Sequence, residues 1–318
     1  MRQLTPLLVV AALFPGCNDK AAPSGQSVAA KGAATSAAGD ETEALAAKLG
    51  PIIDCANRFT NRVLEIRSLY LGWAGDSGPT AETKAAQQFM QLTDPAPCIA
   101  QLGRAIAAPP QLTSLDAAAK AYGDTLAAVS AANKEAIDYY NQNRWKDDAF
   151  AKGIVLHARL TTAWEAFGTV ASALDDAVAE ANRRSHEAHL DRLEQTVGKK
   201  LEWQHGRLML LAEDLAHVAL TEFDRLDAAA LESAITACEA AMNEWTAYLD
   251  AHKDEAATAR AASSFESEGK ATLKSAREIL RAKKAATPPS PQDLSDLHKE
   301  LLGDYNDFID RSNMLFGR

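Results

Sequence analysis

Aromatic residues are scarce in this chain, and no run of it alternates β-branched with polar residues over any length. Aromatics make up 6% of the residues, whereas the apolar fraction of 47% owes much to alanine. Because strands favour β-branched and aromatic residues at a period of two, we predict no sheet. The chain also lacks a phosphate-binding loop, a nucleophile elbow and a dinucleotide-binding fingerprint. We therefore expect a helical protein that is not an enzyme and needs no cofactor.

Clusters of lysine and arginine are missing as well. The chain holds 33 basic and 43 acidic residues, which gives a formal net charge of −10. A body of this sign repels phosphate backbones, so nucleic acid is excluded as a partner. The apolar run near the N-terminus is also far shorter than the ~20 residues that span a bilayer.

Residues 1–16 have the features of a secretory signal peptide. Arg2 supplies a positive charge, residues 7–14 form an apolar run, and Gly16 is a small residue at the expected cleavage point. Because Cys17 follows directly, the segment resembles a bacterial lipobox, in which that cysteine receives lipid and becomes the new N-terminus. We predict lipidation of Cys17, and an ordinary cleaved signal peptide is the alternative.

Residues 17–40 are rich in alanine, glycine and serine and hold few large side chains. Such a segment buries too little apolar surface to offset the entropy lost on ordering, so we predict a flexible tether. Several acyl chains on Cys17 would anchor the protein stably to a membrane. Asn18, in place of aspartate, indicates the outer membrane by the rule known for enteric bacteria. We therefore expect a lipid-anchored protein of the cell envelope that faces the periplasm.

Residues 41–318 form the predicted body, in which apolar residues recur every three or four positions. That interval is typical of one face of an α-helix. We predict an all-α antiparallel bundle of roughly seven to nine helices, with a subdivision near 198–206 as an option. Two of the stripes are Ile52, Cys55, Phe59, Val63, Ile66, Tyr70 and Trp73, then Phe150, Ile154, His157, Leu160, Trp164 and Phe167.

Local signals set the expected helix ends. A short helix is predicted over 81–92, and Asp94 is expected to cap the next one. In the helix that follows, Asn133 interrupts the apolar stripe. Asp293 is expected to cap the last helix.

Three cysteines lie in the body. Cys55 and Cys98 fall on the inward faces of neighbouring predicted helices, and an exported protein can hold a disulfide. We favour a bond between them, with two separate buried thiols as the alternative, because spacing alone does not fix connectivity. Cys238 lies within an apolar stripe and is interpreted as a small buried hydrophobe.

Residues 139–157 make up the most distinctive stretch, YYNQNRWKDDAFAKGIVLH. Together with the segments IIDCANRF and DPAPC, it resembles the YiiG-like family of bacterial lipoproteins, helical proteins with a domain of unknown function. The resemblance covers about residues 45–220. It implies a lipid-anchored, mostly helical envelope protein and a bond between Cys55 and Cys98, and it implies no activity.

The same stretch predicts a corner between two helices. In this interpretation the paired tyrosines end one helix, and Asp147 or Asp148 caps the next at the positive end of its dipole. A recognition site at the tip of the corner is the alternative. Its candidate residues are Tyr139, Tyr140, Trp145, Lys146, Asp147 and Asp148.

Histidines supply only partial metal motifs. His186 and His189 are three residues apart, but the neighbouring sequence offers no clear third ligand. Glu202 and His205 form half of a di-iron motif that needs further carboxylates on other helices. We therefore predict no metal site.

Two functions follow from these observations. The first is a membrane-anchored envelope lipoprotein that binds an envelope protein partner or acts as a scaffold, without catalysis. The alternative is a periplasmic binder of a small ligand or metal through the histidine-rich helical region.

Overall fold

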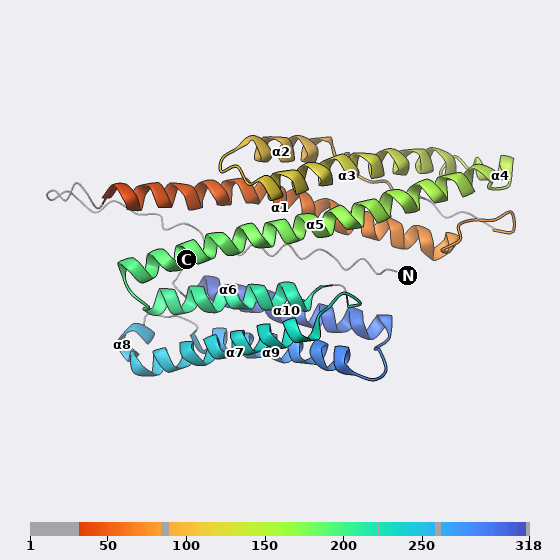
Figure 1. Ribbon diagram of the computed structural model, residues 1–318. Helices are drawn as coiled ribbons and strands as arrows, with labels where there is room; N and C mark the ends of the chain where they lie inside the picture. The colour runs from red at the N-terminus through yellow and green to blue at the C-terminus, as the bar shows by residue number, and fades with distance from the viewer. Residues whose placement is uncertain (1–31, 84–88, 222, 258–261, 316–318) are drawn as a thin grey trace. The chain divides into compact units, whose positions relative to one another are not determined.

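The computed structural model describes the backbone of residues 32–83, 89–221, 223–257 and 262–315, with side chains from Glu43 onward. Over these ranges the chain forms ten helices and no strand, so the predicted all-α fold is confirmed (Figure 1). The helices are α1 (Gly32–Ala74), α2 (Ala96–Ala107), α3 (Thr113–Tyr140), α4 (Trp145–Asp148), α5 (Ala151–Thr196), α6 (Leu201–Ala219), α7 (Ala228–Ala251), α8 (Lys253–Ala256), α9 (Ala262–Lys284) and α10 (Pro291–Met314). Among them, none combines the length and the apolar character that crossing a membrane requires.

The chain divides into two compact units. The N-terminal unit extends to Asn182, and the C-terminal unit begins at Arg183. The division lies within α5, ahead of the 198–206 region where a subdivision was an option.

The core of the N-terminal unit is built from one face each of α1, α3 and α5, which run beside one another (Figure 1). The predicted stripe of α1 is confirmed, since its residues from Ile52 to Tyr70 are buried. One position of the α5 stripe is wrong, because the side chain of Ile154 is 54% exposed. Phe150 precedes the helix and has a φ of 67°, so the interval of four residues to Ile154 does not place the two side chains on one helical face.

The short helix predicted over 81–92 is wrong for residues 89–92, which are not helical. Their backbone groups are bonded to the side chains of Asn133 on α3 and of Asn141, the residue that follows α3, instead of to one another. The position expected for Asp94 is close to correct. Its carboxylate accepts a hydrogen bond from the N–H of Ala96, 3.0 Å away, at the first residue of α2.

The first helix begins earlier than the sequence indicated. Residues 32–40 of the predicted flexible tether belong to α1. This stretch is rich in alanine, the residue with the highest helix propensity, and that propensity favours extension of the helix toward the N-terminus. The remainder of the predicted tether lies outside the described residues.

A buried lysine joins three helices of the N-terminal unit. The side chain of Lys48 on α1 is fully buried, and its Nζ lies 2.7 Å from Oδ1 of Asp116 on α3. The same ammonium donates to the carbonyl oxygens of Ala108 and Ile106, at 2.8 and 3.3 Å. Because these carbonyls lie at the C-terminal end of α2, Lys48 satisfies groups that would otherwise lack helical partners.

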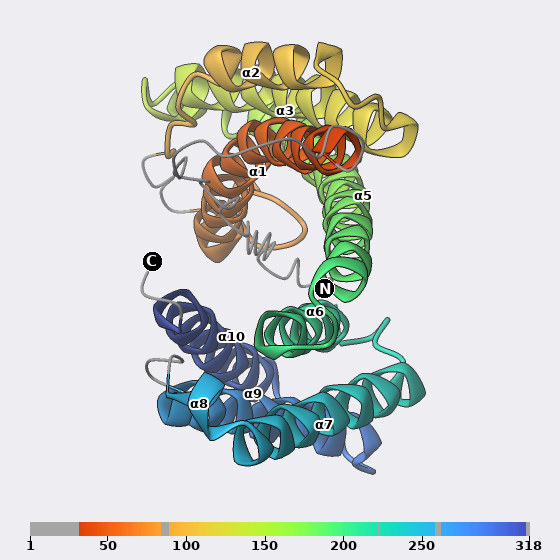
Figure 2. The same ribbon diagram turned by 90° about the vertical axis from the view of Figure 1, so that its left-hand side faces the viewer.

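Four long helices, α6, α7, α9 and α10, form most of the C-terminal unit (Figure 2). A glycine lets three of them approach closely. A Cβ added to Gly269 on α9 would overlap Met242 of α7 and would lie 2.9 Å from Cε2 of Phe308 on α10. Asp293 takes part in capping α10, but as the third helical residue of a capping box whose N-cap is Ser290.

Candidate functional site

The corner between α3 and α5 is held by a carboxylate. Asp148 Oδ1 accepts a hydrogen bond from the hydroxyl of Tyr139 at 2.6 Å, and its Oδ2 accepts the N–H of Lys152 at 3.0 Å. The second bond caps the first turn of α5, as the sequence predicted for Asp147 or Asp148. Between the two helices, Ala149 and Phe150 have φ values of 47° and 67°. Left-handed conformations are costly for residues with a side chain, so these bonds stabilise a strained turn.

The same contacts shift the pKa values of Asp148 and Tyr139. Desolvation alone would raise the pKa of Asp148, but the hydrogen bonds from Tyr139 and from the N–H groups of Lys152 and Phe150 outweigh it and lower that pKa below 3.8. Burial and the bond to Asp148 both raise the pKa of Tyr139. At neutral pH the corner therefore contains a carboxylate paired with a neutral phenol.

An aromatic cluster lies under the corner. Tyr70, Trp73, Phe89, Tyr140, His157 and Trp164 contribute rings whose centroids are 5.2–6.0 Å from a neighbour. The hydroxyl of Tyr70 lies 3.3 Å from that of Tyr140 and 3.2 Å from Nδ1 of His157. Burial raises the pKa of Tyr70 to about 12, and the bond to Tyr140 offsets only part of this effect. The phenol is therefore neutral at physiological pH.

His157 is a structural residue of this cluster. Its Nε2 lies 3.1 Å from the carbonyl oxygen of Asp76, which can only accept, so Nε2 must donate. In the neutral ring Nδ1 is then the acceptor for Tyr70. The ring also leaves no room for a side chain at Gly78, where an added Cβ would lie 2.6 Å from its Cγ. His157 thus fixes the loop that follows α1.

The candidate recognition residues separate into two groups. Tyr139 and Tyr140 are buried in the core, and Asp148 is engaged in the cap. Lys146 and Asp147 are exposed. Trp145 is half-buried, and its ring stacks on Phe150 with centroids 5.0 Å apart. The sequence places these residues in one corner correctly, but few of them are free to contact another molecule.

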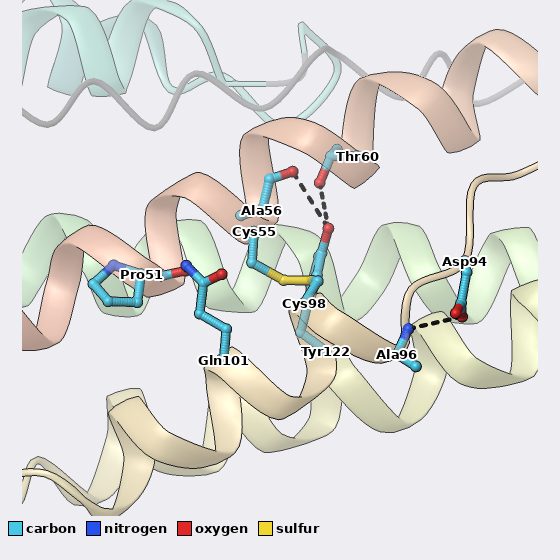
Figure 3. Close-up of a disulfide and its surroundings, with 9 residues drawn as sticks. All are labelled: Pro51, Cys55, Ala56, Thr60, Asp94, Ala96, Cys98, Gln101 and Tyr122. Carbon is cyan, nitrogen blue, oxygen red and sulfur yellow. Dashed lines mark hydrogen bonds between the residues drawn. A yellow bond between two sulfur atoms is a disulfide. The ribbon is translucent and has the colours of Figure 1, made fainter.

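A disulfide joins Cys55 of α1 to Cys98 of α2 (Figure 3). The two Cα atoms are 5.4 Å apart, within the usual range for such a bond. Tyr122 of α3 reaches the same region, where its hydroxyl lies 3.0 Å from that of Thr60 (Figure 3). The pairing favoured from the sequence is therefore present. Cys238 is the free cysteine among the described residues, and burial raises the pKa of its thiol to about 12.

The histidines of the middle region do not converge. His186 of α5 lies 3.0 Å from Oε2 of Glu213 on α6, and both side chains are largely buried. His205 bonds through Nε2 to the hydroxyl of Ser312 at 2.8 Å, while Glu202 is exposed. In the described ranges, no three histidine, cysteine or acidic side chains are placed to hold a metal ion. Cys17, the predicted lipidation site, lies outside those ranges.

Sequence reasoning gave no role to Asn133 and Asn141. Both amides bond to the non-helical segment around Phe89 and Leu92, which lies beside α3. The sequence feature that could have indicated this contact is Asn133 itself. A buried polar residue within an apolar stripe requires a hydrogen-bond partner.

Comparison with known proteins tests the family resemblance that the sequence of the corner segment indicated. A family model described as "Protein of unknown function (DUF3829)" matches residues 43–314. The "Uncharacterized protein YiiG" of Escherichia coli (strain K12) is 29% identical over 204 residues, which cover 63% of this chain and 58% of that protein. No solved structure matches. This chain therefore belongs to the YiiG-like family, whose shared domain is of unknown function.

Proposed function

We propose that this chain is a lipid-anchored protein of the bacterial cell envelope that acts by binding a partner, without catalysis. The disulfide between Cys55 and Cys98 carries the assignment to the envelope. Such bonds persist in oxidising compartments, whereas reducing systems keep cytosolic thiols free. The signal-like residues 1–16 and Cys17 supply the route of export and the attachment to the membrane.

The side chains at the corner between α3 and α5 favour binding over catalysis as the function of the protein. Its carboxylate, phenols and imidazole hold helices and loops together, as the bonds of Asp148 and His157 illustrate. Beside them, Ile154 and Val155 are 54% and 59% exposed at the start of α5. Contiguous exposed apolar surface marks interaction sites, so we place the contact surface at these two neighbouring side chains.

Fractionation tests the location. The parent protein should sediment with membranes and require detergent for release, and density-gradient separation should place it in the outer membrane. A Cys17→Ser variant should instead be released from the periplasm with its disulfide formed. Recovery of both proteins from the cytosol with reduced thiols would contradict the assignment.

Site-specific photo-crosslinking in cells tests binding. A crosslinking residue at Val155 should give one discrete adduct, identified by mass spectrometry. The same residue at exposed Lys270 on α9 is the matched control and should not give that adduct. Identical adduct patterns at the two positions, or no adduct at either, would count against a binding role for this surface.

A further inference from the structure

A relay of hydrogen bonds crosses the aromatic cluster under the corner. It consists of Tyr70 on α1, Tyr140 on α3, and His157 and the carbonyl of Gly153 on α5. The three side chains are buried, since these residues are only 2%, 2% and 8% exposed. The hydroxyl of Tyr70 lies 3.2 Å from Nδ1 of His157 and 3.3 Å from the hydroxyl of Tyr140. Because the hydroxyl of Tyr140 also lies 3.4 Å from the carbonyl oxygen of Gly153, its one proton has two acceptors in reach.

While His157 is neutral, the relay runs in one direction. Nε2 donates to the carbonyl oxygen of Asp76, so Nδ1 carries no proton and accepts that of Tyr70. A hydroxyl has one proton, so the contact between Tyr70 and Tyr140 is then made by the proton of Tyr140. Donation therefore runs from α3 to α1 and from α1 to α5.

A second proton on the ring would reverse the relay without displacing a heavy atom. Nδ1 of His157 then becomes a donor, and the hydroxyl oxygen of Tyr70 accepts its proton. The proton of Tyr70 turns to the oxygen of Tyr140, and the proton of Tyr140 turns to the carbonyl of Gly153. Every polar group of the relay keeps a partner after these two hydroxyl rotations. This is a demanding condition, because a buried donor without an acceptor is costly.

We propose that His157 is a proton-binding site and that its protonation reverses the relay, so that donation ends at Gly153. In the reversed state Tyr140 of α3 is bonded to the first turn of α5, directly before the exposed pair Ile154 and Val155. Protonation thereby adds a bond between α3 and α5 at the corner. This device goes beyond the proposed function and does not depend on a partner.

The titratable groups around the ring suit this role. Burial raises the pKa of Tyr70 to about 12 and that of Tyr140 well above its usual value, so both phenols keep their protons where histidine titrates. The loop after α1 contributes the carbonyl of Asp76, whose side chain is exposed. At the corner the negative charge of Asp148 acts on Tyr140, and a charge of that sign favours a protonated ring. On α5 itself, Arg159 is exposed and engaged in an ion pair.

The acceptor at Gly153 distinguishes the relay from a fixed structural contact. In the neutral direction Tyr140 already has an acceptor in Tyr70, so the carbonyl of Gly153 is not required. In the protonated direction the proton of Tyr140 has no other acceptor among the bonds of the described residues. Removal of the hydroxyl of Tyr140 should therefore penalise the protonated state and leave the neutral state satisfied.

NMR titration of the purified full-length chain, made soluble by Cys17→Ser, tests the proposal. With ¹⁵N-labelled histidine, the ring signals of His157 are those that disappear in His157→Gln. They should show a proton on Nε2 alone at neutral pH and on both nitrogens after acidification, while circular dichroism shows that the helices remain. In Tyr140→Phe the protonated state leaves the hydroxyl of Tyr70 without an acceptor, so the proton affinity of His157 should fall about tenfold.

Tyr122→Phe is the matched control. Tyr122 is a buried phenol of the same unit, and its hydroxyl bonds to Thr60 and Ala56, outside the relay. This variant should leave the proton affinity of His157 unchanged. If Tyr140→Phe does not fold, the ¹³Cζ signal of Tyr140 in the parent decides. It should move with the same midpoint as the ring of His157, because the hydroxyl exchanges partners, whereas the signal of Tyr122 should stay in place.

Three results would overturn the proposal. Equal proton affinity of His157 in Tyr140→Phe and in the parent would show that the relay does not reverse. A signal of Tyr140 that stays fixed while His157 titrates would show the same. A ring of His157 that stays neutral until the helices unfold would show that the folded chain takes up no proton at this site.

Discussion

Replacement of Cys55 and Cys98 by alanine should lower the free energy of unfolding of the N-terminal unit by about 4 kcal/mol. The bond joins residues separated by 43 positions, and the chain-entropy relation gives about 4 kcal/mol for a loop of this size at 25 °C. Domains are commonly stable by only about 5–15 kcal/mol, so the loss would be a large part of the total. It should fall on the N-terminal unit because α1 and α2 both belong to it.

Urea unfolding of the full chain, with Cys17→Ser as the common background, measures this loss. The double alanine variant should unfold at lower urea than the parent, and a reductant should destabilise the parent but not the variant. Cys238→Ala is the matched control, since it removes a buried thiol from the C-terminal unit. It should leave the sensitivity of the parent to reductant unchanged.

Thiol counting decides whether the reasoning stands. In denaturant, alkylation of the parent should add one group before reduction, at Cys238, and three groups after it. Three groups before reduction would refute the disulfide, and the structural support for export would be lost with it. An unchanged unfolding midpoint in the double variant would refute the predicted loss of unfolding free energy.

Three further predictions concern single positions. Gly269→Ala should destabilise the C-terminal unit by about 1–2 kcal/mol in urea unfolding, because the added methyl group overpacks the core. Gly303→Ala should stabilise the same unit by up to ~1 kcal/mol, because a Cβ at this helical position has open space around it. If the two variants changed the free energy of unfolding in the same direction, the packing argument would be contradicted. Lys48→Met should lower the free energy of unfolding by about 3–5 kcal/mol, because it leaves the buried partners of Lys48 unpaired. Lys120→Met, which removes an exposed ion pair, should lower it by less than ~1 kcal/mol. Equal losses in the two variants would show that the Lys48 site is not buried. Burial lowers the pKa of His298 below 6.5, so its stabilising contribution is complete above pH 6.5 and is lost as the pH falls through the folded pKa. The difference in unfolding free energy between the parent and His298→Gln should therefore shrink on acidification, and a constant difference would exclude this origin.

Helical periodicity predicted the fold because most of the stabilising burial follows regular helix faces. The stripe of α1 was correct from Ile52 to Tyr70. At Ile154 the prediction failed where the helix is preceded by left-handed residues, since a periodic pattern assumes that the helix has already begun. Residues 89–92 failed for a related reason, because their backbone partners are the side chains of Asn133 and Asn141, more than 40 positions away.

The corner was predicted in part. Local capping rules predicted that Asp147 or Asp148 would cap α5, because the bond that Asp148 makes joins neighbours in the sequence. The bond between Tyr70 and His157 joins residues 87 positions apart, and no local rule indicates it. The buried role of Lys48 was equally hidden, since its partners come from α2 and α3.

The attachment of the chain to the membrane through Cys17 is the central claim, and the mass of the mature N-terminus tests it most directly. Trypsin digestion of the protein from the membrane fraction should yield the peptide of residues 17–20, with acyl chains on Cys17 and nothing preceding it. An unacylated peptide, or a mature chain that begins at any other residue, would contradict the account.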